Sequence, residues 1–163
     1  MQKRTRFLAH AAILAALYAV LNHFQNILLP GSATWAIQLR MSEALCVLAF
    51  FTPAAIPGLA VGCLLFNLTF IGSLPLDFLV GTLATLGAAG SMWLLRKVPI
   101  VGVLMPALWN AVLVGWELSV YIGGGFWINA LCVAIGEAAV LLNLGLVLYF
   151  TLKSRNLHTR LFA

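Results

Sequence analysis

The sequence predicts an all-α integral membrane protein, folded as a single domain over residues 1–163, with six transmembrane helices of which the second is short. Hydrophobic residues make up 63% of the chain and charged residues only 8%, whereas soluble domains carry about 25% charged residues. Several apolar runs are also long enough to cross the roughly 30 Å hydrocarbon core of a bilayer. The composition therefore argues against a soluble fold, and the net charge of +5 indicates topology and not nucleic-acid binding.

The six predicted spans are residues 7–29, 40–52, 57–72, 76–95, 100–122 and 127–152. The first follows a basic start, as a signal peptide does, but its apolar run is too long and lacks a clear cleavage site. The second holds about 13 residues, which rise only about 20 Å as a helix. Pro53 and Pro57 then turn the chain back. Such a short helix pair predicts a cavity at one side of the membrane, where polar groups are tolerated.

The basic residues outside the spans predict the orientation. Three clusters contain Lys3, Arg4, Arg6, Arg96, Lys97, Lys153, Arg155 and Arg160. Six spans place all three clusters on one side, which should be the cytoplasm. We therefore expect a multi-pass plasma-membrane protein with both termini in the cytoplasm and with aromatic belts formed by Trp35 and Trp127 outside and by Trp93 and Tyr149 inside.

Polar residues within the spans fall almost entirely in the outer half, and we expect them to converge on one ligand site that opens outward. A charge at the centre of a membrane helix costs roughly 2.5–3.5 kcal/mol on insertion scales, so a chain that keeps one usually uses it. The candidates are Arg40, Glu43, Asn67, Asp77, Asn110, Glu117 and Glu137. One arginine among four acids favours a ligand that brings N–H donors or positive charge. The other possibility is that the acids are protonated.

One pair of positions indicates the shape of the ligand. Asn110 and Glu117 are seven residues apart and share a helix face, with Trp109 and Trp116 on the neighbouring face. This spacing favours a planar ligand held at its edge by Asn110 and Glu117 and covered by a tryptophan ring. The alternative is that the tryptophans only pack on lipid or on neighbouring helices.

Each of the other charged candidates has a structural alternative. Glu137, about 15 Å deep in the last span, is either a ligand-binding group or a protonated acid hydrogen-bonded to a neighbouring helix. Asp77 begins a helix, where the helix dipole stabilises an acid, so capping is its alternative role. Glu43 lies one turn from Arg40 and is placed to pair with it. The sequence leaves open whether Arg40 binds ligand or closes a gate.

Small residues form two rows on the first span. One row contains Ala11, Ala15 and Ala19, and the other contains Ala12 and Ala16. Small side chains at four-residue spacing let helix backbones approach closely. We interpret the two rows as a docking face for another membrane subunit, and internal packing is the alternative.

Motifs for catalysis and for cofactor binding are missing from the sequence. It contains no G-x-x-x-x-G-K-[ST] loop, no H-E-x-x-H pair and no nucleophile elbow. Cys46, Cys63 and Cys132 lie in apolar runs, as small buried residues do. We therefore expect no enzymatic activity, no cofactor and no metal.

Three stretches resemble one family of transport proteins. They are Q-L-R-M-S-E-A-L at 38–45, F-F-T-P-A-A-I-P-G-L at 50–59 with Gly62 and Cys63 following, and V-G-W-E-L at 114–118. Together with six short spans, an alanine-rich first helix and no ATPase motif, they resemble the QueT family of S components of energy-coupling factor (ECF) transporters. The likeness covers nearly the whole chain, with departures in the loop at 29–39 and in the tail.

The resemblance implies uptake of queuosine precursors, which are 7-deazaguanine bases such as queuine and its cyano and aminomethyl relatives. It also implies a complex in the lipid membrane with a T component and two cytoplasmic ATPase subunits, for which the alanine face would be the contact. Glu117 or Glu137 would accept the N–H donors of the base. Alternatives are a stand-alone secondary carrier for a cationic or nitrogen-rich heterocycle, a membrane enzyme and a structural subunit.

Overall fold

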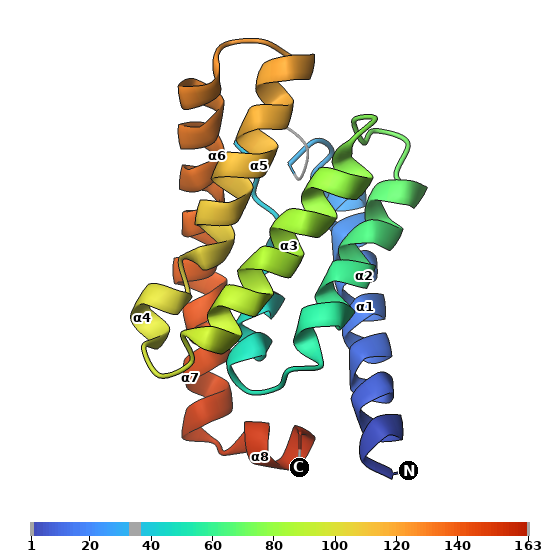
Figure 1. The fold of residues 1–163 in the computed structure, drawn as a ribbon, viewed down its shortest axis with the longest axis vertical. Helices are drawn as coiled ribbons and strands as arrows, with labels where there is room; N and C mark the ends of the chain where they lie inside the picture. The colour runs from blue at the N-terminus through green and yellow to red at the C-terminus, as the bar shows by residue number, and fades with distance from the viewer. Residues whose placement is uncertain (1, 33–36, 163) are drawn as a thin grey trace.

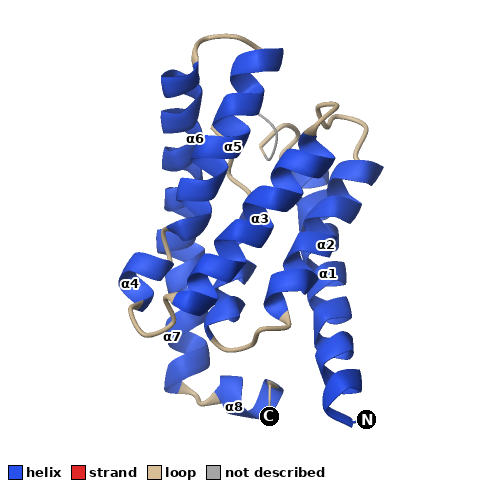
Figure 2. Cartoon of the chain, in the orientation of Figure 1, coloured by secondary structure: helices blue, strands red, loops and turns tan. Residues whose placement is uncertain are grey.

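The computed structural model describes residues 2–32 and 37–162, and every regular element among them is a helix (Figures 1 and 2). In chain order the elements are α1 (Gln2–Leu28), η1 (Met41–Phe50), α2 (Ala55–Thr69), α3 (Asp77–Leu94), α4 (Pro99–Gly102), α5 (Met105–Tyr121), α6 (Phe126–Val140), η2 (Leu141–Gly145), α7 (Leu146–Ser154) and α8 (Leu157–Leu161). The predicted all-α class is confirmed.

Four helical stretches of the described chain are long and apolar enough to cross a membrane: Lys3–Leu28, Asp77–Leu94, Pro99–Tyr121 and Phe126–Ser154. The second and third predicted spans form the shorter helices η1 and α2. A ten-residue 3₁₀-helix and a fifteen-residue α-helix each reach about 20–22 Å, which is less than a hydrocarbon core of about 30 Å. The described structure thus gives four spans by length, and the count of six remains a prediction.

The short second helix lies where the sequence predicts it, but it is a 3₁₀-helix and it occupies the centre of the molecule. Eight of the ten residues of η1 are buried. The main hydrophobic core forms around it from Val47 and neighbouring residues of η1, Leu59 of α2, Met92 of α3 and Leu141 of η2. The other helices therefore pack around η1 as a central support.

Three boundaries differ from the prediction. Residues 100–122, expected as one helix, divide into α4 and α5, and Pro106 stands in the first turn of α5. Proline restricts the residue before it and lacks an N–H donor, so it favours a new helix start there. The last predicted span continues through the π-helical turn η2 into α7. The chain then bends at Asn156, which has a φ of 50°, into the unpredicted α8.

Both termini lie at the same end of the bundle (Figure 1), and the α3–α4 connection with Arg96 and Lys97 lies toward that end. The α5–α6 connection lies at the opposite end. We call the end with the termini the basic end. The three basic clusters thus lie at one end of the molecule, as the sequence predicts. That this end faces the cytoplasm remains a prediction.

The aromatic belts are only partly as predicted. Trp127 is exposed at the end opposite the termini, and Trp93 lies at the basic end under the guanidinium of Arg96, 4.3 Å from its ring centre. Trp35 lies outside the described residues. Tyr149 is buried, with its ring centre 5.4 Å from that of Phe51. Tyr149 is therefore a core residue and not a belt residue.

Helices α1 and α2 approach each other at two glycines. A Cβ atom on Gly58 would lie 2.7 Å from the backbone oxygen of Ala11, and one on Gly62 would lie 2.7 Å from that of Ala15. The obstacle at both positions is backbone, which cannot rotate away. Glycine at 58 and 62 therefore sets the distance between the two helices.

We predict that Gly62→Ala destabilises the protein. The added methyl group would push α1 away from α2, and overpacking of this kind costs typically 1–3 kcal/mol. The melting temperature in detergent, followed by circular dichroism, should fall. Gly90→Ala is the matched control because a Cβ there meets nothing within 4 Å, and it should be neutral or slightly stabilising. Equal effects of the two substitutions would contradict this account.

Candidate functional site

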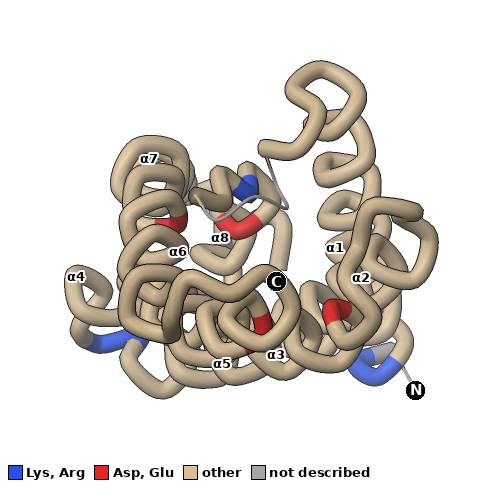
Figure 3. The backbone as a smooth tube through the Cα atoms, turned by 90° about the horizontal axis from the view of Figure 1, so that it is seen from above, with Lys and Arg blue, Asp and Glu red and all other residues tan. Residues whose placement is uncertain are grey.

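All four acidic residues of the chain are buried, although acids are normally found on surfaces. They are Glu43 on η1, Asp77 on α3, Glu117 on α5 and Glu137 on α6. Among the Lys and Arg residues, all of which are described, only Arg40 is buried, at 1% exposure. Figure 3 shows the acidic positions on several helices around the middle of the bundle. Burial of charge is expensive unless other groups compensate it, so this concentration marks the candidate site.

Arg40 lies at the centre of these acids. Its guanidinium interacts electrostatically with the carboxyl groups of Asp77 and Glu137 and with that of Glu117. Glu137 also interacts with Glu43, and Glu117 with Asp77. The structure thus brings together the five charged residues that the sequence predicts to converge. We call them the charged cluster.

An extended segment carries Arg40 into the bundle. Gln38 and Arg40 are buried, while the apolar residues at 37, 39 and 41 are exposed, which is the alternation of an extended chain. A Cβ on Gly136 of α6 would collide with the backbone of Gln38. Glycine at 136 therefore lets the segment pass α6 closely enough for the guanidinium to reach the interior.

Gln25 of α1 holds this segment by its backbone. Its side-chain N–H donates to the carbonyl oxygen of Leu39, and its Oε1 accepts the backbone N–H of Met41 at 2.8 Å. The same N–H group donates to Ser32 Oγ at 2.8 Å. The sequence indicates no such role for Gln25, because a polar residue near the end of a span fits the membrane interface equally well.

Two of the four acids have donors within the protein. The Tyr18 hydroxyl donates to Glu43 Oε1, and the Cys46 thiol donates to Glu43 Oε2 at 3.1 Å. Asp77 Oδ2 accepts the backbone N–H of Leu74 at 2.6 Å, which is the reach-back contact of a helix cap. Asp77 therefore lies in the first turn of α3 and holds the preceding loop, although α3 has no side-chain cap hydrogen bond at Leu76. Glu43 pairs with Tyr18 and not simply with Arg40.

The other two acids, Glu117 and Glu137, and the nearby amide of Asn110 have no such donors in the described part of the chain. Within residues 2–32 and 37–162, no donor reaches the carboxylate oxygens of Glu117 or Glu137, and the amide of Asn110 has no partner. The carboxyl group of Glu117 lies close enough to that of Asp77 to share a hydrogen bond when one of the two is protonated. All three side chains are fully buried. An unsatisfied buried polar group costs about 1–3 kcal/mol, and more when it is charged. These three residues therefore hold the hydrogen-bonding capacity that a ligand would use.

Asn67 lies beside the charged cluster and links two helices. Its Nδ2 donates to the carbonyl oxygen of Asp77 at 2.7 Å, which ties α2 to the start of α3. A Cβ on Gly81 would lie 2.7 Å from Asn67 Nδ2 and 3.6 Å from a guanidinium nitrogen of Arg40. Asn67 and Gly81 thus enclose the guanidinium on the α2–α3 side.

The structure does not bring the two predicted stacking residues to the charged cluster. Trp109 Nε1 donates to Ser91 Oγ at 3.0 Å, and its ring packs on Gly87 of α3. Trp116 is 48% exposed. Neighbouring residues of a helix point about 100° apart, so residues next to Asn110 and Glu117 face away from the interior. Packing on a neighbouring helix and on lipid describes both tryptophans better than stacking on a ligand.

The two alanine rows of α1 differ in their exposure. Ala11 and Ala15 face the glycines of α2 and pack inside the molecule. Ala12 and Ala16 are exposed, and Ala19 is half-buried. The docking face predicted for α1 is therefore limited to the row of Ala12 and Ala16, where it remains a prediction.

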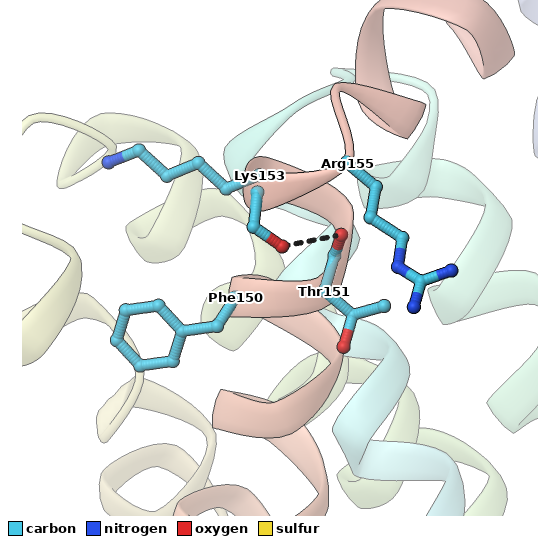
Figure 4. A pocket seen from close by; sticks show the side chains of 5 residues that line it. Phe150, Thr151, Lys153 and Arg155 are labelled. Atoms are coloured by element: carbon cyan, nitrogen blue, oxygen red, sulfur yellow. Dashed lines mark hydrogen bonds between the residues drawn. The ribbon is translucent and has the colours of Figure 1, made fainter.

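A hollow of about 580 Å³ lies at the basic end and is unrelated to the charged cluster. Figure 4 shows its lining by α7, with Phe150 and Lys153 pointing to one side of the helix and Arg155 to the other. Its polar groups do not converge on one point, so it has no features of a ligand site. No group of three His, Cys, Asp or Glu side chains in the described residues is placed to hold a metal ion.

Comparison with known proteins agrees with this geometry. Residues 8–154 match the family model described as QueT transporter, a range that contains the whole charged cluster. No curated protein matches the chain, and no solved structure does. With nearly the whole sequence matched, and with apolar helices of membrane-spanning length around a buried polar centre, the chain belongs to the QueT transporter family.

Proposed function

We propose that this chain is the substrate-binding S component of an ATP-driven ECF importer and that it binds a 7-deazaguanine precursor of queuosine from outside the cell. One observation carries the proposal: Glu117, Glu137 and Asn110 are fully buried in a membrane transport protein, and their side chains are not satisfied by hydrogen-bond donors of the described residues. Membership of the family supports the transport role. The chemistry of these three groups supports the class of ligand.

A 7-deazaguanine matches the groups that the site offers. Its ring N–H and its exocyclic amino group are adjacent donors, and a carboxylate accepts two parallel N–H bonds well. Each such charge-assisted bond contributes roughly 1.5–3 kcal/mol. The amide of Asn110 donates as well as accepts, so it suits the carbonyl or a ring nitrogen of the base. The aminomethyl relative adds a cation, which a second acid would hold.

The two acids are held on neighbouring, closely packed helices. Glu117 lies on α5 and Glu137 on α6, and these helices contact each other along their length. A Cβ on Gly115 would lie 2.7 Å from the backbone of Ala130, so the spacing of the two helices is narrow and fixed. The contact of Gly115 with Ala130 places Glu137 more than two helical turns from the level of Glu117. We therefore place the edge of the planar base at one of these two carboxyl groups, with Arg40, Glu43, Asp77 and Asn67 nearby.

Entry of the base requires a movement, because every residue of the charged cluster is buried. The α5–α6 connection at the end opposite the termini contains Gly123, Gly124 and Gly125, all with φ between 83° and 90°. Side-chain-bearing residues rarely adopt this conformation, whereas glycine does so freely. Separation of the outer ends of α5 and α6 at this connection would admit the base from outside.

The proposed complex places this chain in the plasma membrane with both termini in the cytoplasm. A membrane-embedded T component would contact the row of Ala12 and Ala16, and two cytoplasmic ATPase subunits would supply the energy. The alternative is a stand-alone secondary carrier. It is favoured by one observation, the electrostatic contact of Glu137 with Glu43, since neighbouring carboxyl groups can share and transfer a proton.

We predict that Glu117→Gln and Glu137→Gln each weaken the binding of queuine and of the two prequeuosine bases to the purified chain. Loss of one charge-assisted hydrogen bond should lower the affinity on the order of tenfold to a hundredfold, as measured by calorimetry. Asn143→Leu is the control, because Asn143 is an exposed amide on the same continuous helix as Glu137. If both glutamine variants bind as tightly as the parent, the site is wrong.

We predict opposite effects on stability for Glu137→Gln and Tyr18→Phe without ligand. The first removes one of four carboxyl groups that surround a single buried arginine, and the oxygens of this one have no hydrogen-bond donor among the described residues, so it should raise the melting temperature. The second removes the donor to Glu43 and should cost about 1–3 kcal/mol. Tyr121→Phe makes the same chemical change at an exposed position and should be neutral. A melting temperature lowered by Glu137→Gln would show that the interaction of Glu137 with Arg40 outweighs the cost of burying its carboxyl group.

We predict that uptake depends on the partner complex. Proteoliposomes that contain this chain with a T component and two ATPase subunits should accumulate labelled base when ATP is present and not with a non-hydrolysable analogue. Liposomes with this chain alone should bind the base without accumulating it. Accumulation by the chain alone, driven by a proton gradient, would support the secondary carrier instead.

A further inference from the structure

One face of α1 changes character along its length at the basic end. Lys3, Arg6, His10, Ile13 and Leu17 follow one another at spacings of three and four residues, which places them on one face of a helix. The first three are basic and the last two are apolar. The stripe spans about 21 Å at 1.5 Å per residue. Its order, from basic to apolar, is that of a phospholipid headgroup followed by its acyl chains.

The basic part of this stripe lines a cavity of about 290 Å³. Lys3, Arg6 and His10 form one wall, the connection of residues 52–54 before α2 forms another, and Phe162 after α8 closes it. None of the four acids of the chain is among the residues that line it. The ionisable residues of its lining are thus all basic, which favours an anion as the occupant.

The apolar part lines a second cavity of about 410 Å³. Its lining comprises leucine and isoleucine side chains from α1, η1, α7 and α8, together with His10 and Phe162. These two residues line both cavities, and their rings meet edge to face at 5.5 Å. The apolar cavity is thus a continuation of the basic one.

The helix packing gives the second cavity the form of a groove. Helices α1 and α7 both contact η1, whose Leu45 and Leu48 line the groove between them. Figure 1 shows α8 running from the end of α7 toward the beginning of α1, and Leu161 of α8 lines the groove. Ile13 and Leu17 are exposed on the α1 side, so the groove is accessible from the hydrocarbon core.

We propose that these two cavities bind one anionic phospholipid. Its phosphate lies near Lys3, Arg6 and His10, and one acyl chain lies along η1 between α1 and α7. Basic residues near a membrane surface attract anionic lipids, so a zwitterionic lipid with the same chains binds more weakly. A protein helix is a poorer occupant, because at about 10 Å across only about one turn fits a volume of this size.

Native mass spectrometry of the full chain in detergent, with equal amounts of phosphatidylglycerol and phosphatidylcholine of identical acyl chains, tests the proposal. The parent should retain one phosphatidylglycerol in preference. The double variant Lys3→Gln with Arg6→Gln should lose that preference on the order of tenfold. Arg96→Gln with Lys97→Gln is the matched control, since it removes the same charge at the same end without touching either cavity. It should keep the preference.

A second variant tests the groove separately from the charges. Leu17→Trp fills the apolar cavity and should reduce retention of both lipids, while queuine affinity and helix content stay those of the parent. Equal retention of the two lipids by the parent overturns the proposal. So does a loss of the phosphatidylglycerol preference in Arg96→Gln with Lys97→Gln as large as that in Lys3→Gln with Arg6→Gln. If Leu17→Trp keeps the lipid but no longer recovers the T component from membranes, the groove belongs to a protein partner. The lipid-retention measurements, which decide the proposal, do not depend on the proposed substrate.

Discussion

The burial of Arg40 among four acids is the constraint on which the rest of the structure depends. A charge in the interior of a membrane protein requires compensation, and here it comes from the acids of α3, α5 and α6 together. The helices that provide the acids must therefore face one point. Gly136 allows the segment with Arg40 to enter, and Gln25 of α1 holds its backbone. The polar centre is consequently supported by all the main helices.

The position of this centre could be predicted from the sequence, because the cost of burying charge in an apolar chain is local and large. The helical period likewise places Asn110 and Glu117 on one face. The sequence does not distinguish the acids that have donors from those that lack them. Tyr18, which donates to Glu43, lies 25 residues earlier, and only the packing of α1 on η1 brings the two together. The same limit applies to Trp109, whose partner is Ser91 of α3.

The docking face on α1 shows the same distinction between pattern and packing. Both alanine rows have the four-residue spacing of close helix contacts, so the spacing by itself cannot tell an internal face from an external one. The signal that separates them is on another helix. Gly58 and Gly62 of α2 have the same spacing and pack on Ala11 and Ala15. A search for matched small-residue rows on two helices would have assigned this row to the interior.

The unsatisfied groups of the site also bear on how transport is coupled to binding. Natural domains are stable by only about 5–15 kcal/mol, and each buried polar group without a partner costs about 1–3 kcal/mol. Glu117, Glu137 and Asn110 therefore consume a substantial part of that stability. Under the proposed function, a ligand that satisfies them would stabilise the closed bundle relative to an open one in which α5 and α6 lie further apart. Closure and binding would then be one equilibrium, and the loaded protein would present a more rigid surface to a partner than the empty one.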